Sequence, residues 1–258
     1  MSEIKTPAEA ARELLYKKKS VYERRDEAAI EAAYEYAKGY AKYLDDAKTE
    51  REAVWASIKL AEAEGFVPYA FGDEITVGGK YYYNNRGKNL FLFSIGSEAL
   101  TEGIRISAAH IDSPRIDLKQ VPLYEDSGMA FLKTHYYGGI KKYQWTAIPL
   151  ALHGVIVKAD GTSVNVKIGE EAGEPKFVIS DILPHLGAEQ SKRTLSEGIQ
   201  GEELNVIIGS RPFKSDEGSE LVKLNILKLL NEKYGVTEEE FARLESLVHE
   251  RAAEFRSR

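Results

Sequence analysis

The spacing of hydrophobic residues changes along this chain, and that change limits the folds it can adopt. Up to Gly65, apolar residues recur at helical spacing behind capping boxes that begin at Thr6 and Thr49. From about residue 74, short apolar runs bounded by turn residues are typical of strands. Helical spacing returns over 219–235. This order predicts an α/β fold with a mixed central sheet and helices, plus a β-rich unit that begins near residue 158.

Several segments carry specific predictions. Residues 28–44 predict a helix whose tyrosines pack against other elements, and the pair Gly78–Gly79 predicts the turn of a hairpin. Residues 89–96 and 103–111 predict strands buried on both faces. Further strands are predicted over 146–157, 175–186 and 203–212, with a hairpin turn at Asp160–Gly161. Gly235 ends the penultimate predicted helix, and Thr237 caps a last, charged amphipathic one.

The composition excludes several classes of function. The net charge of -6 argues against nucleic acid or an anionic membrane as the main partner. The absence of cysteine excludes disulfides, thiol nucleophiles and cysteine-based zinc sites. The longest apolar stretch, 145–157, is too short to cross a bilayer, and the first residues contain no apolar signal core. We therefore expect a cytoplasmic protein.

The segment AAHIDSPRIDLK, residues 108–119, contains the first candidate for chemistry. If it ends a strand, His110 and Asp112 point to the same side, because residues two apart share a face. Asp112 could then fix the tautomer of His110, as a carboxylate does behind a metal-binding histidine. A hydrogen-bonded pair at a strand end, without metal, fits the same spacing.

Other candidates are weaker on pattern alone. Residues 133–145 combine His135, the pair Gly138–Gly139 and four aromatic residues, which is typical of either a tight turn or a close backbone approach to a ligand. His153 lies in an apolar run and reads as a core histidine, while His249 reads as exposed. Ser113 lacks the surroundings of a nucleophile, and neither G-x-S-x-G nor H-E-x-x-H occurs.

Taken together, the segments AHIDSPRIDLK, PLYEDSGMAFLKTHYYGGIKKYQW, PLALHGV and LPHL resemble the aspartyl aminopeptidase and aminopeptidase I family of zinc metallopeptidases. NRGKN and the helix pair in KLNILKLLNEKYGVTEEEF fit the same family, in its bacterial branch. The resemblance runs from about residue 40 to residue 241. The tail after Phe241 does not resemble the family's continuation.

The resemblance implies a catalytic α/β domain interrupted by a β-rich dimerisation domain. Here these parts would be residues 1–157 and 158–235, followed by a C-terminal helix over 236–258. It also implies two zinc ions, replaceable by cobalt or manganese, the removal of N-terminal, often acidic, residues from peptides, and assembly into dodecamers. His110 matches a metal ligand, and Asp112 matches the aspartate that orients it. His135, Gly138 and Gly139 match a stretch near the active-site entrance, and His185 matches a histidine that reaches a neighbouring subunit's site.

The family's other metal ligands have no counterpart in this chain. A catalytic zinc needs about three protein ligands and a water molecule, so His110 alone does not suffice. We therefore expect the chain to be inactive alone and to need a missing C-terminal chain. The alternative is a non-catalytic assembly scaffold of the same family. Half a sheet would expose an edge strand and an apolar face, which predicts self-association or a partner chain.

Overall fold

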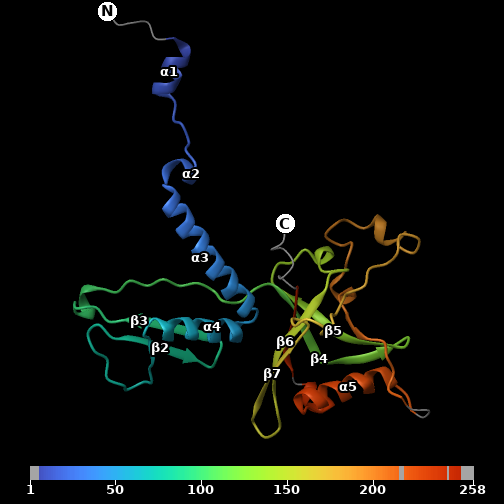
Figure 1. The fold of residues 1–258 in the computed structure, drawn as a ribbon. Helices are drawn as coiled ribbons and strands as arrows, with labels where there is room; N and C mark the ends of the chain where they lie inside the picture. Colours follow the sequence, from blue (N-terminus) through green and yellow to red (C-terminus); the bar gives the residue numbers. More distant parts are fainter. Residues whose placement is uncertain (1–5, 215–217, 243, 251–258) are drawn as a thin grey trace, which may run out of the picture. The chain divides into compact units, whose positions relative to one another are not determined.

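The structure is a computed structural model that describes residues 6–214, 218–242 and 244–250. It divides into two compact units, Met1–Leu44 and Asp45–Arg258, which are described separately here. Among the described residues, no helix is both long enough and apolar enough to cross a membrane. Helices and sheets both occur, which confirms the predicted α/β class (Figure 1).

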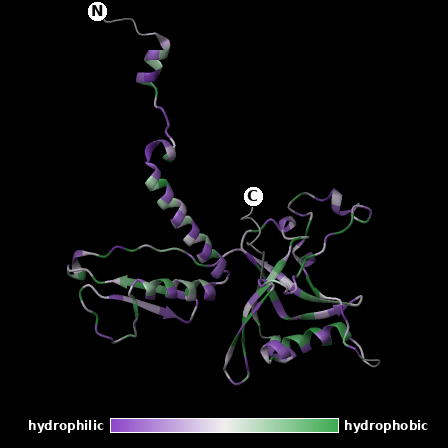
Figure 2. Ribbon diagram, viewed as in Figure 1, coloured by the Kyte–Doolittle hydropathy of each residue, from purple (hydrophilic) through white to green (hydrophobic). Residues whose placement is uncertain are grey.

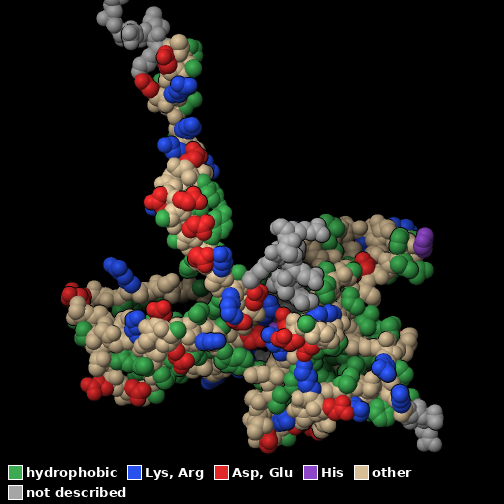
Figure 3. All heavy atoms as spheres, viewed as in Figure 1, with side chains coloured by type: hydrophobic (Ala, Val, Ile, Leu, Met, Phe, Trp, Pro, Cys, Tyr) green, Lys and Arg blue, Asp and Glu red, His purple; other side chains and the backbone are tan. Residues whose placement is uncertain are grey.

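The first unit consists of helices without a core. They are α1 (Pro7–Leu14), α2 (Val21–Arg24) and α3 (Glu27–Asp46), whose last two residues belong to the second unit. The capping box predicted at Thr6 is present, with Glu9 as its partner. No residue of these helices is buried, and hydrophobic side chains line the surface of α3 (Figure 3). The prediction that the tyrosines of α3 pack against other elements is therefore wrong for Tyr36, which is 79% exposed.

The second unit begins with α4 and a small sheet. Helix α4 (Glu50–Ala63) starts at the predicted Thr49 cap, and Gly65 follows it with φ +84°. The sheet has the order β1-β2-β3, with β1 (Val67–Pro68) parallel to β2 (Lys80–Asn85) and β2 antiparallel to β3 (Asn89–Ser94). The hairpin turn lies at 86–88, where Arg86 and Gly87 adopt positive φ, instead of at Gly78–Gly79. Gly78 also has positive φ, but its turn precedes β2 and does not join two paired strands.

A larger sheet has the strand order β7-β6-β9-β4-β5-β8. Its strands are β4 (Arg115–Asp126), β5 (Met129–Tyr137), β6 (Leu150–Val157), β7 (Ser163–Ile168), β8 (Val206–Gly209) and β9 (Glu245–Glu250). Strands β6 and β7 form the hairpin predicted around Asp160–Gly161, and β8 lies within the predicted run 203–212. The hairpin of β4 and β5, which turns at Ser127–Gly128, was not predicted.

The last strand corrects the predicted C-terminal helix. A short helix, α6 (Glu238–Phe241), follows the predicted Thr237 cap, but the chain then forms β9. Strand β9 pairs with β6 on one side and with β4 on the other. These backbone hydrogen bonds outweigh the helical spacing of the charged residues, because they complete the ladders of two strands. Residues 251–258 lie outside the described part of the chain.

Residues 103–111 do not form the predicted buried strand. No strand is assigned between Gly103 and Pro114, and Ile104 and Ile106 are exposed. The side chains of β3 are also exposed or only half-buried. Apolar composition alone does not make a strand, since the backbone of a strand needs a neighbour with which to share hydrogen bonds. Within the described residues, 103–111 have no such neighbour.

The predicted boundary between two domains lies between residues 157 and 158, at the end of β6. Strands β6 and β7 lie on either side of this position and belong to one sheet (Figure 1). The run 175–186 contributes only isolated bridges, through Phe177, Val178 and Ile179, and not a full strand. The assignment of 1–157 to a catalytic portion and 158–235 to a dimerisation domain stays a prediction.

The hydrophobic core lies between the larger sheet and helix α5 (Leu221–Tyr234), which ends at Gly235 as predicted. Figure 2 shows hydrophobic residues along these strands and on α5. Leu132 of β5, Leu152 of β6 and Leu230 of α5 are buried there. Burial of this kind supplies most of the free energy that holds a helix against a sheet. The core therefore fixes β4 and β5, whose ends adjoin His110 and Asp112.

Candidate metal centre

Within the described part of the chain, the imidazole of His110 is held through one ring nitrogen, Nδ1. Its Nδ1 lies 2.9 Å from the backbone carbonyl oxygen of Asp112 and 3.2 Å from Oδ1 of the same residue. A carbonyl oxygen can only accept, so Nδ1 carries the proton and donates it. The lone pair of the ring is then on Nε2, which is the atom a metal would need. The side chain is 83% exposed.

The carboxylate of Asp112 is held through Oδ2, the oxygen that does not face His110. The hydroxyl of Tyr137, at the end of β5, donates a hydrogen bond of 2.9 Å to Oδ2 of Asp112. This bond, with smaller contributions from the backbone and from His110, holds the pKa of Asp112 below its ordinary value. The same bond raises the pKa of Tyr137. Asp112 therefore contacts His110 as an ionised carboxylate, and its predicted role in orienting a metal ligand stays a prediction.

Arg115 connects this pair to the sheet. Its guanidinium lies over the ring of Tyr137, 4.0 Å from the ring centroid. Its Nε donates to Oδ1 of Asp117 over 2.9 Å, and its Nη1 lies 3.0 Å from Glu50 at the start of α4. Burial raises the pKa of Asp117, and the hydrogen bond from Arg115 opposes that rise. Arg115 is itself mostly buried, so these partners compensate its charge.

His135 and the two glycines lie beside this network. His135 faces Asp117 across the β4–β5 ladder, with Nε2 4.0 Å from Oδ2 of Asp117. Gly138 follows β5 with φ +76°, and a Cβ there would be 3.4 Å from Pro114. A Cβ at this distance would make an ordinary van der Waals contact, so it is the positive φ of Gly138, and not a close backbone approach, that favours glycine there. Gly139 faces open space.

The remaining histidines lie elsewhere. His185 is exposed in the loop after Ile179 and makes no hydrogen bond or ion pair with another described residue. His153 is buried in β6, as predicted, with Nδ1 2.8 Å from Glu52 and Nε2 3.0 Å from Glu170. Both of its ring nitrogens therefore face carboxylates. His249 belongs to β9, and its side chain is outside the described residues.

The described residues fit one metal ligand with its support, but not a complete site. No group of three or more His, Cys, Asp or Glu side chains that could hold a metal occurs among them. His110 offers one nitrogen, whereas a catalytic zinc takes about three protein ligands. No catalytic step through a metal can therefore be derived from these residues alone.

Three supporting residues were missed by the sequence analysis: Arg115, Asp117 and Tyr137. The register of the β4–β5 hairpin pairs Arg115 with Tyr137 and Asp117 with His135. The available signal was the turn Asp126-Ser127-Gly128-Met129, whose central residues both adopt positive φ. Recognising that turn would have paired β4 with β5, but without the bulge after Leu118 it would have placed Tyr137 opposite Leu118 instead of Arg115.

Comparisons with known proteins agree on the family. The family described as aminopeptidase I zinc metalloprotease (M18) matches residues 43–254. The match extends past Phe241, so the expectation that the tail is unrelated to the family is wrong. A probable M18 family aminopeptidase 1 from Clostridium acetobutylicum is 49% identical over 237 residues, which are 90% of this chain and 51% of that protein. The chain thus spans about half the length of this relative.

Solved structures give the same result. The crystal structure of an M18 aminopeptidase from Thermotoga maritima matches with a TM-score of 0.83 and 42% identity, over 92% of this chain and 51% of that one. That of aminopeptidase I from Clostridium acetobutylicum matches with a TM-score of 0.79 and 43% identity, over 92% and 53% of the two chains. From the family match and these relatives, the chain belongs to the M18 family of zinc metallopeptidases, a family of hydrolases.

Proposed function

We propose that this chain supplies part of the active site of a zinc aminopeptidase, with His110 as a metal ligand and Asp112 as the residue that orients it. The observation that carries the proposal is the Nδ1 contact of His110 with the Asp112 carbonyl, which leaves Nε2 available. The bound zinc would polarise the peptide carbonyl and activate water. The remaining ligands would come from a segment or chain outside the described residues, so the chain alone would be inactive.

The residues of this chain would act by positioning. Asp112, held by Tyr137, keeps the imidazole in the tautomer that binds metal. Gly138, with φ +76°, turns the chain after β5 beside Pro114, and we place His135 and Gly139 near the entrance for a peptide because the family resemblance implies it. We propose two zinc ions in the complete site, replaceable by cobalt or manganese, and acidic N-terminal residues as the preferred substrates. The resemblance to aspartyl aminopeptidases supports these finer points.

We further propose that the complete protein is a cytoplasmic homo-oligomer in which His185 reaches a neighbouring copy. The loop around His185 exposes several large apolar side chains, Ile182, Leu183, Leu186 and Leu195. Clusters of exposed apolar side chains are typical of surfaces that are covered in an assembly. Dimers that build a dodecamer, as the family resemblance implies, would cover this loop.

The experiment joins this chain, after residue 254, to the part of the Clostridium acetobutylicum relative that lies beyond the match. The chimaera is assayed for zinc content and for hydrolysis of glutamyl-, aspartyl- and leucyl-p-nitroanilide. We expect bound zinc and activity that is lost in His110→Ala, with the two acidic substrates preferred. A folded, zinc-loaded chimaera that hydrolyses none of the three would overturn the proposal. Hydrolysis of leucyl-p-nitroanilide alone would overturn only the acidic preference.

The alternative, a non-catalytic scaffold, is favoured by one observation. The described residues contain no complete cluster of metal ligands. Light scattering with size-exclusion chromatography on the unmodified chain separates the two cases. A stable oligomer of one size, combined with a chimaera that does not bind zinc, would favour the scaffold. Aggregation of the chain alone, combined with an active chimaera, would favour the enzyme.

A further inference from the structure

A second site lies under helix α5, away from His110. A cavity of ≈ 880 Å³ lies between α5 and the larger sheet. Its walls are mainly apolar side chains, including Leu132, Leu152, Ile168, Phe177, Ile226 and Leu229. Interiors of proteins are close-packed, with few voids larger than a water molecule. A cavity of this volume falls within the range of small-molecule sites, about 300–1,000 Å³.

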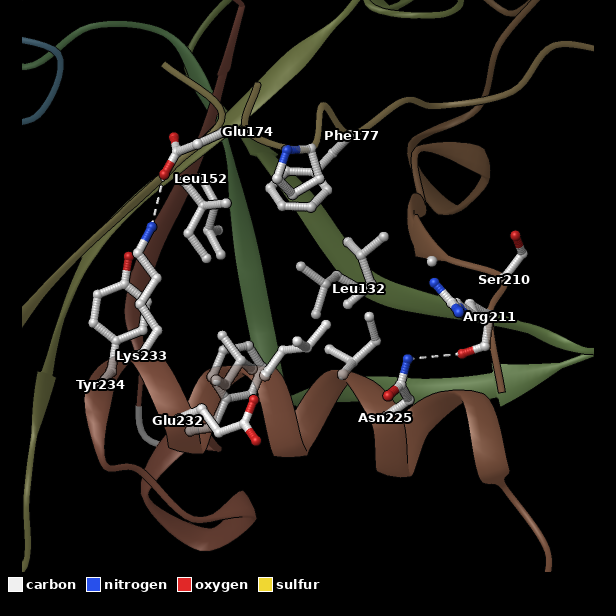
Figure 4. A pocket seen from close by; sticks show the side chains of 18 of the residues that line it. Leu132, Leu152, Glu174, Phe177, Ser210, Arg211, Asn225, Glu232, Lys233 and Tyr234 are labelled. Atoms are coloured by element: carbon white, nitrogen blue, oxygen red, sulfur yellow. Dashed lines mark hydrogen bonds and ion pairs between the residues drawn. The ribbon is translucent and has the colours of Figure 1, made fainter. Parts of the chain in front are cut away.

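The charged groups around the cavity are distributed unequally. At one end, Lys233 and Glu174 neutralise each other over 2.7 Å. At the other end lie Ser210 and Arg211, both exposed to solvent (Figure 4). The backbone carbonyl of Arg211 accepts a hydrogen bond from Asn225, but no carboxylate of the described residues pairs with its guanidinium. Glu232, which also lines the cavity, pairs with Lys228 over 3.0 Å. The charges away from Arg211 are thus neutral by pairing, and the end at Arg211 carries a cation.

This arrangement selects one chemical class of ligand. The apolar middle suits an unbranched hydrocarbon chain, because such a chain fills the space and removes apolar surface from water. The cation at the mouth suits a carboxylate, which an arginine binds through two parallel hydrogen bonds. A neutral ligand would gain no ion pair with the guanidinium of Arg211, and a cationic ligand would be repelled by it.

We propose that the cavity under α5 binds a free fatty carboxylate, with its hydrocarbon chain along Ile226, Leu229 and Phe177 and its carboxylate at Arg211. Leu132 lies on β5, the strand that also carries His135 and Tyr137. The site is therefore built into the same sheet as the candidate metal centre, but its lining residues include none of that centre's residues.

The test is equilibrium dialysis of the full chain against radiolabelled dodecanoate below its micellar concentration, with dodecan-1-ol as the uncharged comparison. We expect saturable binding near one dodecanoate per chain and about tenfold weaker binding of the alcohol. Arg211→Gln should reduce dodecanoate affinity to that of the alcohol. Lys214→Gln, at an exposed lysine three residues later that does not line the cavity, should leave it unchanged.

A cavity-filling variant tests the location independently of charge. Leu229 lines the cavity and is half exposed, so Leu229→Trp can place its ring in the mouth without disturbing the buried core. We expect it to weaken both ligands while the circular dichroism spectrum is unchanged. Absence of saturable dodecanoate binding would overturn the proposal. So would binding that Leu229→Trp and Arg211→Gln leave unaffected.

Discussion

The hydroxyl of Tyr137 donates a 2.9 Å hydrogen bond to Oδ2 of Asp112, and this bond ties the end of β5 to the segment that carries His110. Asp112 uses its other oxygen and its carbonyl toward Nδ1 of His110. The orientation of the candidate ligand therefore depends on a strand that is fixed by the core of the larger sheet. A metal ligand on an irregular segment gains its geometry in this way.

Tyr137→Phe should weaken metal binding without unfolding the protein. Removal of this hydroxyl leaves Asp112 free to rotate away from His110, and the loss of such a partner typically weakens metal affinity about tenfold or more. The measurement is the dissociation constant for zinc in the chimaera, by competition with a chelating dye. Tyr136→Phe is the matched control, since Tyr136 makes no contact with Asp112 and should change nothing. Equal effects of the two variants would contradict this role for Tyr137.

Gly138→Ala should destabilise the fold, whereas Gly139→Ala should not. Gly138 has φ +76° and lies against Pro114, so a Cβ there is strained by about 1–2 kcal/mol. Gly139 lies outside the left-handed region and faces open space. Urea unfolding of both variants measures the difference in free energy. If Gly139→Ala destabilised the protein as much as Gly138→Ala, the backbone explanation would be wrong.

His153→Leu should destabilise the second unit strongly. His153 is 1% exposed and lies between Glu52 of α4 and Glu170 after β7. Replacement by an apolar residue removes the hydrogen-bonding partner of two mostly buried carboxylates. This should lower the free energy of unfolding by about 3 kcal/mol. Thermal and urea unfolding provide the measurement. His185→Leu, at an exposed histidine with no described partner, serves as the control and should stay within about 0.5 kcal/mol of the parent.

Glu174→Gln should lower stability in a manner that depends on pH. The hydrogen bond from Lys233, aided by the N–H groups of Gly169 and Glu171, lowers the pKa of Glu174 from 4.5 to about 2. A lowered folded-state pKa stabilises the protein above the unfolded value, and that stabilisation is lost as pH falls from about 4.5 toward 2.

The loss in Glu174→Gln should therefore be about 1–2 kcal/mol near pH 6, allowing for solvent around Lys233, and smaller near pH 3. The free energy of urea unfolding at the two pH values measures it. Glu232→Gln removes a surface pair with Lys228 on the same helix and should have little effect at either pH. A loss in Glu174→Gln that stays constant between the two pH values would show that the carboxylate charge is not responsible.

The contact between His110 and Asp112 was predictable from the sequence, whereas most of its surroundings were not, and the metal-binding role of the pair stays a prediction. His110 and Asp112 do contact each other, because two residues of separation bring them together in any extended backbone. The register that brings Tyr137 to Asp112 was not predictable from spacing. Val121 adopts φ +48°, and the five-residue step from Leu118 to Leu123 faces only the two-residue step from Thr134 to Leu132. This bulge shifts every pair beyond it, and no local residue pattern specifies its size.

Predictions of helix caps, which depend on residues close in sequence, were correct, and two predictions that depend on pairing with distant strands were not. The capping boxes at Thr6, Thr49 and Thr237 were correctly predicted, because a cap depends only on residues a few positions apart. Residues 103–111 were predicted to form a strand but pair with no described strand. Residues 245–250 were predicted to be helical but form a strand that pairs with both β4 and β6. Only tertiary structure decides such cases.

The position of β9 has a consequence for the order in which the protein folds. Among the described residues, β9 lies between β4 and β6, and Val248 pairs with both Ile116 and Leu152. Isolated bridges through Phe177 and Val178 also connect β6 with β8. The hairpins β4–β5 and β6–β7 involve near neighbours in sequence and can form while the chain is being synthesised. The pairing through Val248 must wait for a residue made 132 positions after Ile116 and 96 positions after Leu152, which is slow because of the large loop that must close. Until then the edges of β4 and β6 that β9 covers stay unpaired, and unpaired strand edges are prone to aggregation.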